Sequence, residues 1–217
     1  SYNDEGDRTP EQIISHLAAA GAAGAANAKP QAVGAITSYG RYTAEVFAAL
    51  PNLAVVSKTG TGVDNIDVEA ATRNGTVVCN VPGYGTEVVS DHAIALALAV
   101  LRRINETDAD LRAGIWDFRR RRPLGQVHGR TFGVVGYGSI GRAAARKARG
   151  LGFNVVVWDR KGVPGRRTPE DFPYLGLDEL LETADVVSFH VALVPETRHL
   201  LSAERITRMK KDAVVVN

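Results

Sequence analysis

Residues 133–141 read Gly-Val-Val-Gly-Tyr-Gly-Ser-Ile-Gly and join two short apolar runs, Thr131–Val135 and Asn154–Trp158. Strong helix formers dominate the intervening Arg142–Leu151, so the order is strand, glycine-rich turn, helix, strand. Two strands joined through a helix lie parallel in one sheet. The segment therefore predicts a doubly wound, parallel α/β domain.

Each glycine of the turn has a predicted task in holding a dinucleotide. Gly136 allows the tight turn, Gly138 lets the backbone approach a pyrophosphate, and Gly141 lets the helix pack on the strand. The free N–H groups at the start of the helix would face the phosphates. A carboxylate follows the second strand and would bind the adenosine ribose hydroxyls, which favours NAD over NADP. The predicted cofactor-binding residues of this unit are Gly136, Tyr137, Gly138, Ser139, Ile140, Gly141, Asp159 and Arg160.

Basic residues close to Asp159 leave the choice of cofactor open. Arg160 and Lys161 follow it directly, and Arg166 and Arg167 come soon after. Any of these cations would be able to meet the 2′-phosphate of NADP. The sequence thus predicts a dinucleotide site more firmly than it predicts NAD.

Composition and charge exclude several classes of protein. The net charge of +2 over 217 residues gives no reason to expect nucleic acid or a membrane surface as partner. The longest apolar stretch, Ala93–Leu101, is too short to span a bilayer, and the polar residues 1–12 do not resemble a signal peptide. The single cysteine, Cys79, is expected to be a buried thiol in a reducing cytoplasm.

The first hundred residues alternate helix and strand patterns, which predicts a second parallel α/β sheet. We expect a substrate domain over residues 1–100 and an NAD-binding domain over 101–217. The apolar helix Thr86–Arg103 is expected to be buried between the two. The remaining predicted helices of this half are Glu11–Ala20, Thr43–Leu50 and Val68–Arg73, and its strands are Gln31–Thr37, Leu53–Ser57 and Thr76–Cys79.

The second half is predicted to begin with a short helix, Asp108–Gly114, followed by four arginines, Arg119–Arg122. The arginines are interpreted as a solvated linker face, with an anion-binding patch as the minority alternative. Beyond the glycine-rich unit, the predicted strands are Asp185–Phe189 and Ala213–Val216, and the predicted helices are Ser139–Leu151, Leu177–Thr183 and Ala203–Lys210.

Several spaced motifs in the same order resemble the D-isomer-specific 2-hydroxyacid dehydrogenase family, and within it the branch of C-terminal-binding-protein-like dehydrogenases. Besides the glycine-rich loop, the motifs are Lys58–Asp67, Asn80–His92, Gly114–Trp116, Asp185–His190 and Pro195–Leu200. The resemblance runs from about Thr9 to Asn217. It implies two open parallel-sheet domains: a flavodoxin-like substrate domain and a Rossmann NAD-binding domain that is incomplete at its C-terminus.

The resemblance also implies where ligands bind. The substrate carboxylate would sit on backbone N–H groups of Gly60, Thr61 and Gly62, with Lys58 as a flanking cation or, equally, a lysine at the end of a strand. Val89 would pack near the nicotinamide ring. The residues expected around the adenine and its ribose are His190, Val191, Ala192 and Thr197.

Two departures from the family pattern affect these expectations. The chain has His190-Val-Ala-Leu-Val194 where many relatives have His-x-Pro-Leu-Thr, so this loop is expected to be less rigid. The family's catalytic Arg, Glu and His lie beyond the position that matches Asn217, so no catalytic residue is predicted within this chain. We therefore expect an incomplete copy of a longer protein, with little activity by itself.

The leading hypothesis is an NAD-dependent oxidoreductase that moves a hydride between NAD(H) and a small 2-hydroxy or 2-keto acid. It is expected to be a homodimer at full length, with no nucleic-acid or membrane partner. One alternative is an NAD(H)-responsive, corepressor-like protein-binding module or an inactive fragment. Another is an enzyme of a different class with a similar nucleotide domain, such as an adenosylhomocysteine hydrolase.

Overall fold

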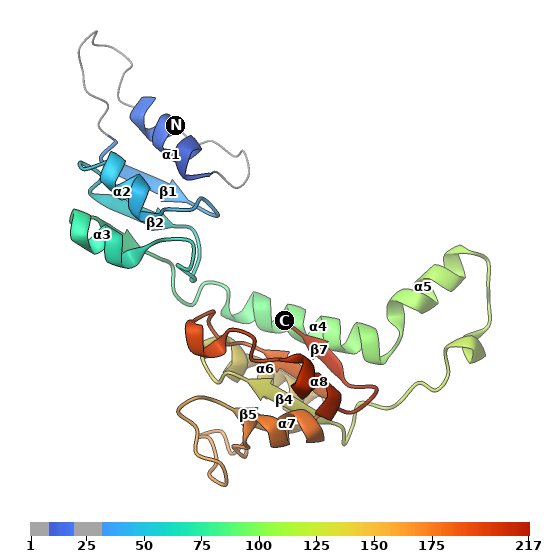
Figure 1. Cartoon of the computed structure of the whole chain (residues 1–217). Helices are drawn as coiled ribbons and strands as arrows, with labels where there is room; N and C mark the ends of the chain where they lie inside the picture. The colour runs from blue at the N-terminus through green and yellow to red at the C-terminus, as the bar shows by residue number, and fades with distance from the viewer. Residues whose placement is uncertain (1–8, 20–31) are drawn as a thin grey trace. The chain divides into compact units, whose positions relative to one another are not determined.

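The computed structural model describes residues 9–19 and 32–217, and the chain forms two compact units that join at Tyr84–Gly85. Figure 1 labels the helices and strands of each. The helix α4 (Thr86–Leu101) belongs to the second unit, because it packs on α6 (Ser139–Gly150) and β7 (Val214–Val216). The boundary between the compact units thus lies before α4. The division into a substrate domain and an NAD-binding domain at residue 100 stays a prediction.

A three-stranded parallel sheet in the order β1-β2-β3 forms the first unit. Its strands are β1 (Gly34–Thr37), β2 (Val55–Lys58) and β3 (Val77–Cys79), and its helices are α1 (Pro10–Ala19), α2 (Ala44–Ala49) and α3 (Val68–Asn74). These agree with the predicted elements to within a few residues at each end, which is the ordinary uncertainty of element boundaries. The predicted end residues Ala20 and Gln31 lie outside the described residues.

Local signals explain the bounds of α3. The Asp67 side chain accepts a hydrogen bond from the N–H of Ala70 (2.8 Å) and so caps the first turn. Gly75 ends the helix with a φ of 76°, a left-handed conformation that glycine adopts without steric cost.

One face of the first sheet carries the core of this unit. Val56 and Phe47 are buried there, while Ile36 and Val77 on the strands' other face are 74% and 59% exposed. Cys79 ends the edge strand β3 in register with Ser57, and its side chain is exposed. The prediction of a buried thiol was therefore wrong, because Cys79 shares the open face with Val77 rather than the packed one.

The second unit is a four-stranded parallel sheet in the order β5-β4-β6-β7. The strands other than β7 are β4 (Thr131–Val135), β5 (Asn154–Trp158) and β6 (Val186–Phe189). The first strand in the sequence, β4, lies between β5 and β6, with Val135 in register with Trp158 and Phe189. The strands that follow β4 in the sequence therefore lie on both sides of it, which makes β4 the switch point of the sheet. In open α/β sheets, the carboxyl ends of the strands at such a point form a crevice.

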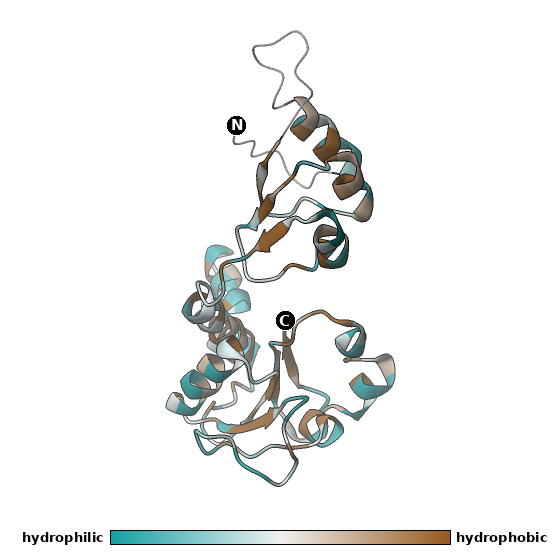
Figure 2. Ribbon diagram, turned by 90° about the vertical axis from the view of Figure 1, so that its left-hand side faces the viewer, coloured by the Kyte–Doolittle hydropathy of each residue, from teal (hydrophilic) through white to brown (hydrophobic). Residues whose placement is uncertain are grey.

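Helices cover both faces of this second sheet. The side chains of Phe132 and Val134 pack on the face of α4 and α6, and Val135 packs on the face of α7 (Leu177–Thr183). Gly133 makes room for α7, because a Cβ there would lie 2.6 Å from a methyl carbon of Leu180. The short helix α8 (Ala203–Arg208) packs on α7. Figure 2 shows the strands as predominantly hydrophobic elements. The predicted α/β class with parallel sheets is confirmed.

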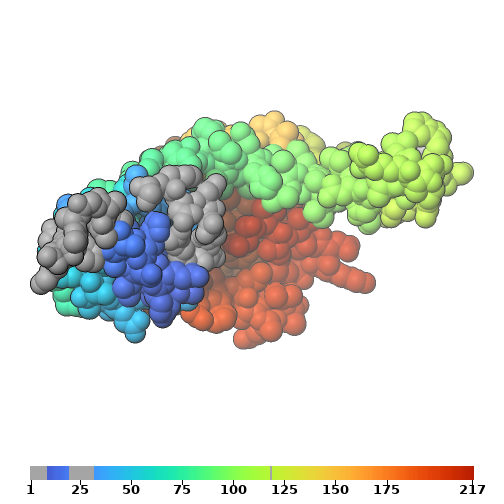
Figure 3. Space-filling view, turned by 90° about the horizontal axis from the view of Figure 1, so that it is seen from above, coloured from blue at the N-terminus to red at the C-terminus, as the bar shows by residue number. Residues whose placement is uncertain are grey.

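The segment after α4 differs from the prediction. The helix expected over Asp108–Gly114 begins earlier and ends at Arg112, as α5 (Ile104–Arg112). In Figure 1, α5 and the residues after it stand clear of the sheet of their unit, and Figure 3 shows the same stretch projecting from the rest of that unit. Within the second unit, α6 and β7 cover the face of α4 that carries Ala93 and Ala97, whereas Val88 and Val100 are 70% and 55% exposed. The expected burial of α4 between the two domains stays a prediction.

Three of the four arginines after α5, Arg119, Arg120 and Arg121, form ion pairs with carboxylates. Arg121 makes a two-point contact with the buried Asp110, with Nε–Oδ2 at 2.7 Å and Nη2–Oδ1 at 2.6 Å. Arg119 pairs with Asp117 (2.9 Å). These contacts connect α5 to the 3-10 turn η1 (Phe118–Arg121). The side chains of Arg119 and Arg120 are 75% and 47% exposed, in agreement with a solvated face, whereas Arg121 is only 28% exposed. Over residues 9–19 and 32–217, no helix is long and apolar enough to cross a membrane.

Candidate functional site

The glycine-rich loop after β4 has the close packing that its spacing predicts. Gly136 has a φ of 97°, and a Cβ there would lie 2.8 Å from the carbonyl carbon of His190. A Cβ on Gly141 would overlap the carbonyl oxygen of Gly136. A Cβ on Gly138 would meet nothing within 4 Å. Packing thus requires glycine at 136 and 141, whereas Gly138 borders open space.

That open space lies at the start of α6, a helix of 12 residues without a side-chain cap at its N-terminus. The first turn of a helix carries N–H groups with no partner inside the helix and the positive end of the helix dipole. Ser139, its first residue, is exposed, and Ile140 is partly so. The residues present therefore fit the pyrophosphate of a dinucleotide.

The carboxylate predicted to bind the ribose is held by the main chain. Asp159 Oδ2 accepts a hydrogen bond from the N–H of Tyr137 (3.0 Å), and Oδ1 accepts one from the N–H of Lys161 (2.9 Å). Two of the four nearby cations have partners of their own: Arg160 lies 3.9 Å from Glu196, and Arg167 pairs with Asp171. This arrangement favours a ribose hydroxyl rather than a 2′-phosphate beside Asp159.

Tyr137 is the residue between the first two glycines of the loop, and its ring is buried. Its hydroxyl donates a hydrogen bond to Glu170 Oε2 (2.7 Å) and lies 3.4 Å from Thr168 Oγ1. Burial, together with the negative charge of Glu170, raises the pKa of Tyr137 to about 12. Sequence reasoning missed Glu170, because it lies in an irregular segment after β5 and belongs to no motif.

Residues 190–197 pass beside the same loop. The N–H of His190 donates to the carbonyl of Val135 (2.7 Å), and its Nε2 lies 2.9 Å from Ser188 Oγ. Burial lowers the pKa of His190 to about 4, so the ring is neutral at pH 7. A side-chain methyl of Val191 lies next to Gly136. The structure therefore brings His190 and Val191 to the glycine-rich loop, and their contact with an adenine or ribose stays a prediction.

Thr197 braces the part of this loop that follows Val191. Its Oγ1 donates to the carbonyl of Ala192 (2.6 Å) and accepts from the N–H of Val194 (3.0 Å). The hydroxyl thus links both sides of the turn before the 3-10 segment η2 (Pro195–Thr197). These local hydrogen bonds restrain the turn.

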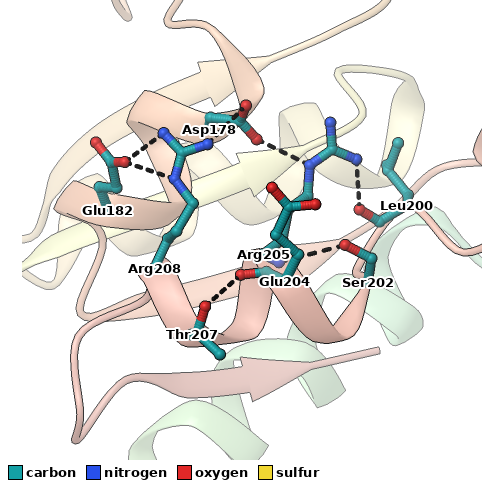
Figure 4. Close-up of polar contacts among 8 residues, drawn as sticks. All are labelled: Asp178, Glu182, Leu200, Ser202, Glu204, Arg205, Thr207 and Arg208. Carbon is teal, nitrogen blue, oxygen red and sulfur yellow. Dashed lines mark hydrogen bonds and ion pairs between the residues drawn. The ribbon is translucent and has the colours of Figure 1, made fainter.

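Figure 4 shows an ion-pair cluster between α7 and α8 that supports the end of the same loop. Arg205 donates to Asp178 Oδ1 (2.8 Å) and to the carbonyl of Leu200 (2.9 Å). Arg208 contacts Asp178 and Glu182, and the hydrogen bonds and charge of these arginines hold the pKa of Asp178 below its usual range. Each guanidinium has a carboxylate partner, so we assign the cluster a structural role.

The predicted carboxylate loop lies in the first unit, beside a cavity of about 400 Å³. Lys58 is 8% exposed, donates to the carbonyl of Ser38, and places its ammonium 5.0 Å from the centre of the Tyr39 ring. In the part of the chain that the structure describes, we find no hydrogen-bond partner for the N–H groups of residues 60–62. A cation and free N–H donors beside one cavity suit an anion such as a carboxylate.

Hydrogen bonds with Asn80 and Val81 hold the loop of residues 60–62 in place. The Gly60 carbonyl accepts from the N–H of Val81 (3.0 Å), and the Thr61 carbonyl accepts from Asn80 Nδ2 (2.8 Å). Thr61 also donates its hydroxyl to the Val81 carbonyl (3.1 Å). The carbonyls and the hydroxyl are thus engaged, which leaves the N–H groups as the open donors of the loop.

Val89 lies in the first turn of α4, in the second unit, and its side chain is 45% exposed. It is thus accessible for a contact with a ring, which stays a prediction. Among residues 9–19 and 32–217, no group of three or more His, Cys, Asp or Glu side chains is arranged to hold a metal ion.

Comparison with known proteins places these features in context. Residues 94–217 match the model of the D-isomer specific 2-hydroxyacid dehydrogenase NAD binding domain. A glyoxylate reductase of Korarchaeum cryptofilum is 42% identical over 177 residues, which cover 80% of this chain and 53% of that protein. The chain spans between a third and just over half of the length of the curated relatives it matches.

The chain is also similar to solved structures. The TT0316 protein from Thermus thermophilus superposes with a TM-score of 0.80 at 37% identity, over 94% of this chain and 61% of that one. The D-lactate dehydrogenase from Aquifex aeolicus, solved with NAD and lactic acid, superposes with a TM-score of 0.76 at 26% identity, over 84% of this chain and 54% of that one.

Proposed function

Because this chain belongs to the D-isomer specific 2-hydroxyacid dehydrogenase family, we propose that its protein transfers a hydride between NAD(H) and a small 2-hydroxy or 2-keto acid. The observation that carries the proposal is the open space before Gly138 at the uncapped start of α6, with Asp159 oriented beside it. Bound NAD would supply the hydride acceptor. The residues of the chain bind the cofactor and the substrate and orient them.

In this proposal α6 and its loop hold the pyrophosphate through Gly138, Ser139 and Ile140. The Asp159 carboxylate accepts hydrogen bonds from the ribose hydroxyls. Neutral His190 packs beside the loop rather than moving a proton, because a group with a pKa of about 4 is scarcely protonated at pH 7 and is a weak base there.

The free N–H groups of Gly60, Thr61 and Gly62 hold the substrate carboxylate, and Lys58 adds positive charge beside them. Binding through N–H groups and an ammonium recognises the carboxylate that all small acids share, and does not distinguish one substrate side chain from another. We assign no acid–base residue, since the Arg, Glu and His that the family resemblance implies have no matching position in this chain.

The test is a titration of the 217-residue chain with NADH, followed by nicotinamide fluorescence. We expect saturable binding that ADP displaces, because ADP carries the same pyrophosphate and ribose. Absence of saturable binding would refute the cofactor site. Steady oxidation of NADH with glyoxylate or pyruvate by this chain would instead contradict the assignment of no acid–base residue.

We also propose that the protein is a homodimer through its second unit. Val100, Ile104, Leu111 and Trp116 follow one another along α4, α5 and the segment beyond, and each is at least 50% exposed. Apolar side chains exposed in such a series are typical of an interface between proteins. Sedimentation equilibrium is expected to give a dimer, and Trp116→Ser and Leu111→Ser together are expected to give a monomer.

The narrower resemblance, to C-terminal-binding-protein-like dehydrogenases, leads to an alternative: an NAD(H)-responsive protein-binding module. The dehydrogenase and the binding module differ in whether the protein reduces a 2-keto acid. A longer protein from the same gene that binds NADH but reduces no 2-keto acid would support the module. Reduction of glyoxylate or pyruvate by that protein would support the dehydrogenase.

A further inference from the structure

Glu170 lies outside every predicted motif, yet it contacts the glycine-rich loop and the helix that follows it. Its Oε2 accepts the hydroxyl hydrogen of Tyr137, and its Oε1 lies 3.4 Å from Arg142 and 3.8 Å from Arg146 on α6. Arg149 of the same helix donates to the Glu170 backbone carbonyl (2.9 Å). Glu170 is thus connected to the loop and to successive turns of α6.

Tyr137 carries this connection to the predicted ribose site. Its hydroxyl bonds to Glu170 at one end of the residue, and its backbone N–H bonds to Asp159 Oδ2 at the other. Its ring is buried against Phe172 and Tyr174, at centroid distances of 6.3 and 6.2 Å. A rigid side chain anchored at its tip fixes the position of its own backbone, so Glu170 influences the orientation of the Asp159 carboxylate.

We propose that Glu170 is a positioning residue of the cofactor site, which acts through Tyr137 to orient Asp159 toward the adenosine ribose. The inference rests on the proposed placement of NAD on this loop. It extends that function by adding a residue that touches no cofactor atom and sets how strongly the ribose hydroxyls are bound.

The hydroxyl contact is the part of the Glu170 environment that can have this effect. Arg142 and Arg146 are nearly half exposed, and ion pairs of that kind contribute little. The tyrosine hydroxyl is enclosed, and its other neighbour, Thr168 Oγ1, is 3.4 Å away. Without Glu170 the hydroxyl would lack a good acceptor, and the tyrosine would shift to find one.

The experiment measures binding of ADP and of 2′-deoxy-ADP to the 217-residue chain by calorimetry. Glu170→Ala is expected to weaken ADP about fivefold, the worth of one hydrogen bond, and to weaken 2′-deoxy-ADP clearly less. A residue that only stabilised the fold would weaken both probes equally, since they share the pyrophosphate and adenine. The melting temperature of each variant shows that the fold is kept.

Three further variants test whether Glu170 acts through the hydroxyl of Tyr137. Glu170→Gln keeps an acceptor for the tyrosine hydroxyl and is expected to restore most of the ADP affinity. Tyr137→Phe is expected to reproduce the loss, and Tyr137→Phe with Glu170→Ala is expected to lose no more than either alone, because both remove the same link. Glu179→Ala, which removes an exposed carboxylate of α7, is the matched control and is expected to bind both probes normally.

The outcomes separate the two proposals. If the wild-type chain binds neither probe, the cofactor placement fails, and the role of Glu170 fails with it. If the wild type binds ADP and Glu170→Ala binds it equally well, only the role of Glu170 is overturned. Equal weakening of both probes, or additive losses in the double variant, would also overturn it.

Discussion

The Lys147 ammonium on α6 lies 2.6 Å from Asp91 Oδ1 and 2.8 Å from Glu87 Oε2, so one side chain meets two carboxylates of α4. It also donates to the hydroxyl of the fully buried Ser90 (2.7 Å). Desolvation opposes the charge of Lys147, but the hydrogen bonds to Asp91 and Glu87 prevail and raise its pKa. The start of α4, which carries Val89, is thereby fastened to the helix of the glycine-rich loop.

Lys147→Met is expected to lower the free energy of unfolding by about 1–2 kcal/mol, because one hydrogen bond to a buried hydroxyl and two ion pairs are lost. Urea denaturation measures the change. Lys211→Met removes a charge from an exposed lysine and is expected to change stability by less than about 0.5 kcal/mol. Equal stability of the two variants would contradict a role of Lys147 in joining the helices.

Gly138 and Gly141 are expected to respond in opposite ways to alanine. Gly141→Ala should destabilise the second unit by about 2 kcal/mol or more, because its Cβ would overlap the Gly136 carbonyl and force the loop away from α6. Gly138→Ala should leave the melting temperature nearly unchanged, since its Cβ meets no atom, and should abolish detectable NADH binding. Normal NADH binding by Gly138→Ala would contradict the placement of the pyrophosphate.

His190 predicts a particular dependence of stability on pH. Its pKa is about 4 in the folded chain and about 6.5 when unfolded, so only the unfolded chain takes up the proton between these values. Stability should therefore fall as the pH drops from about 6.5 toward 4, by about 3 kcal/mol at most. Urea denaturation at about pH 7 and about pH 4.5 is expected to show a smaller difference for His190→Gln than for the wild type. An identical difference would contradict the burial of a neutral ring.

Thr197→Val is expected to lower the free energy of unfolding by about 1 kcal/mol, because the hydroxyl that joins the Ala192 carbonyl to the Val194 N–H is replaced by a methyl group. Thr197→Ser keeps the hydroxyl and should retain most of this stability. Thermal unfolding compares the two variants. If serine is as unstable as valine, the hydroxyl does not brace the loop.

The fold could be read from the sequence wherever a repeating pattern was tied to local chemistry. The runs around the glycine-rich loop predicted β4, α6 and β5 almost to the residue. The prediction for Cys79 depended on its tertiary neighbours and was wrong. Apolar side chains all round α4 do not show which of its faces packs within the second unit, and the apolar strand that ends in Cys79 does not show that the cysteine lies on the open face of an edge strand.

For the site, the sequence predicted the close packing of the glycine-rich loop, because Gly136 and Gly141 have steric reasons that the spacing reveals. Residues 60–62 were named from the family resemblance, and the roles of both loops stay predictions. The sequence had no signal for Glu170, which reaches Tyr137 from an irregular segment, or for Lys147, whose partners lie on another helix. Contacts of these kinds follow from three-dimensional packing and leave no periodic trace along the chain.

The two main-chain hydrogen bonds to Asp159 have a consequence for redesign of this protein. Replacing Asp159 by serine would remove a negative charge and also release the N–H groups of Tyr137 and Lys161, which now point at the carboxylate oxygens. Those donors would then be available to the oxygens of a 2′-phosphate, with Arg160 adjacent. Exchange of one nicotinamide cofactor for the other would therefore start from a partly formed phosphate cradle that the native carboxylate fills.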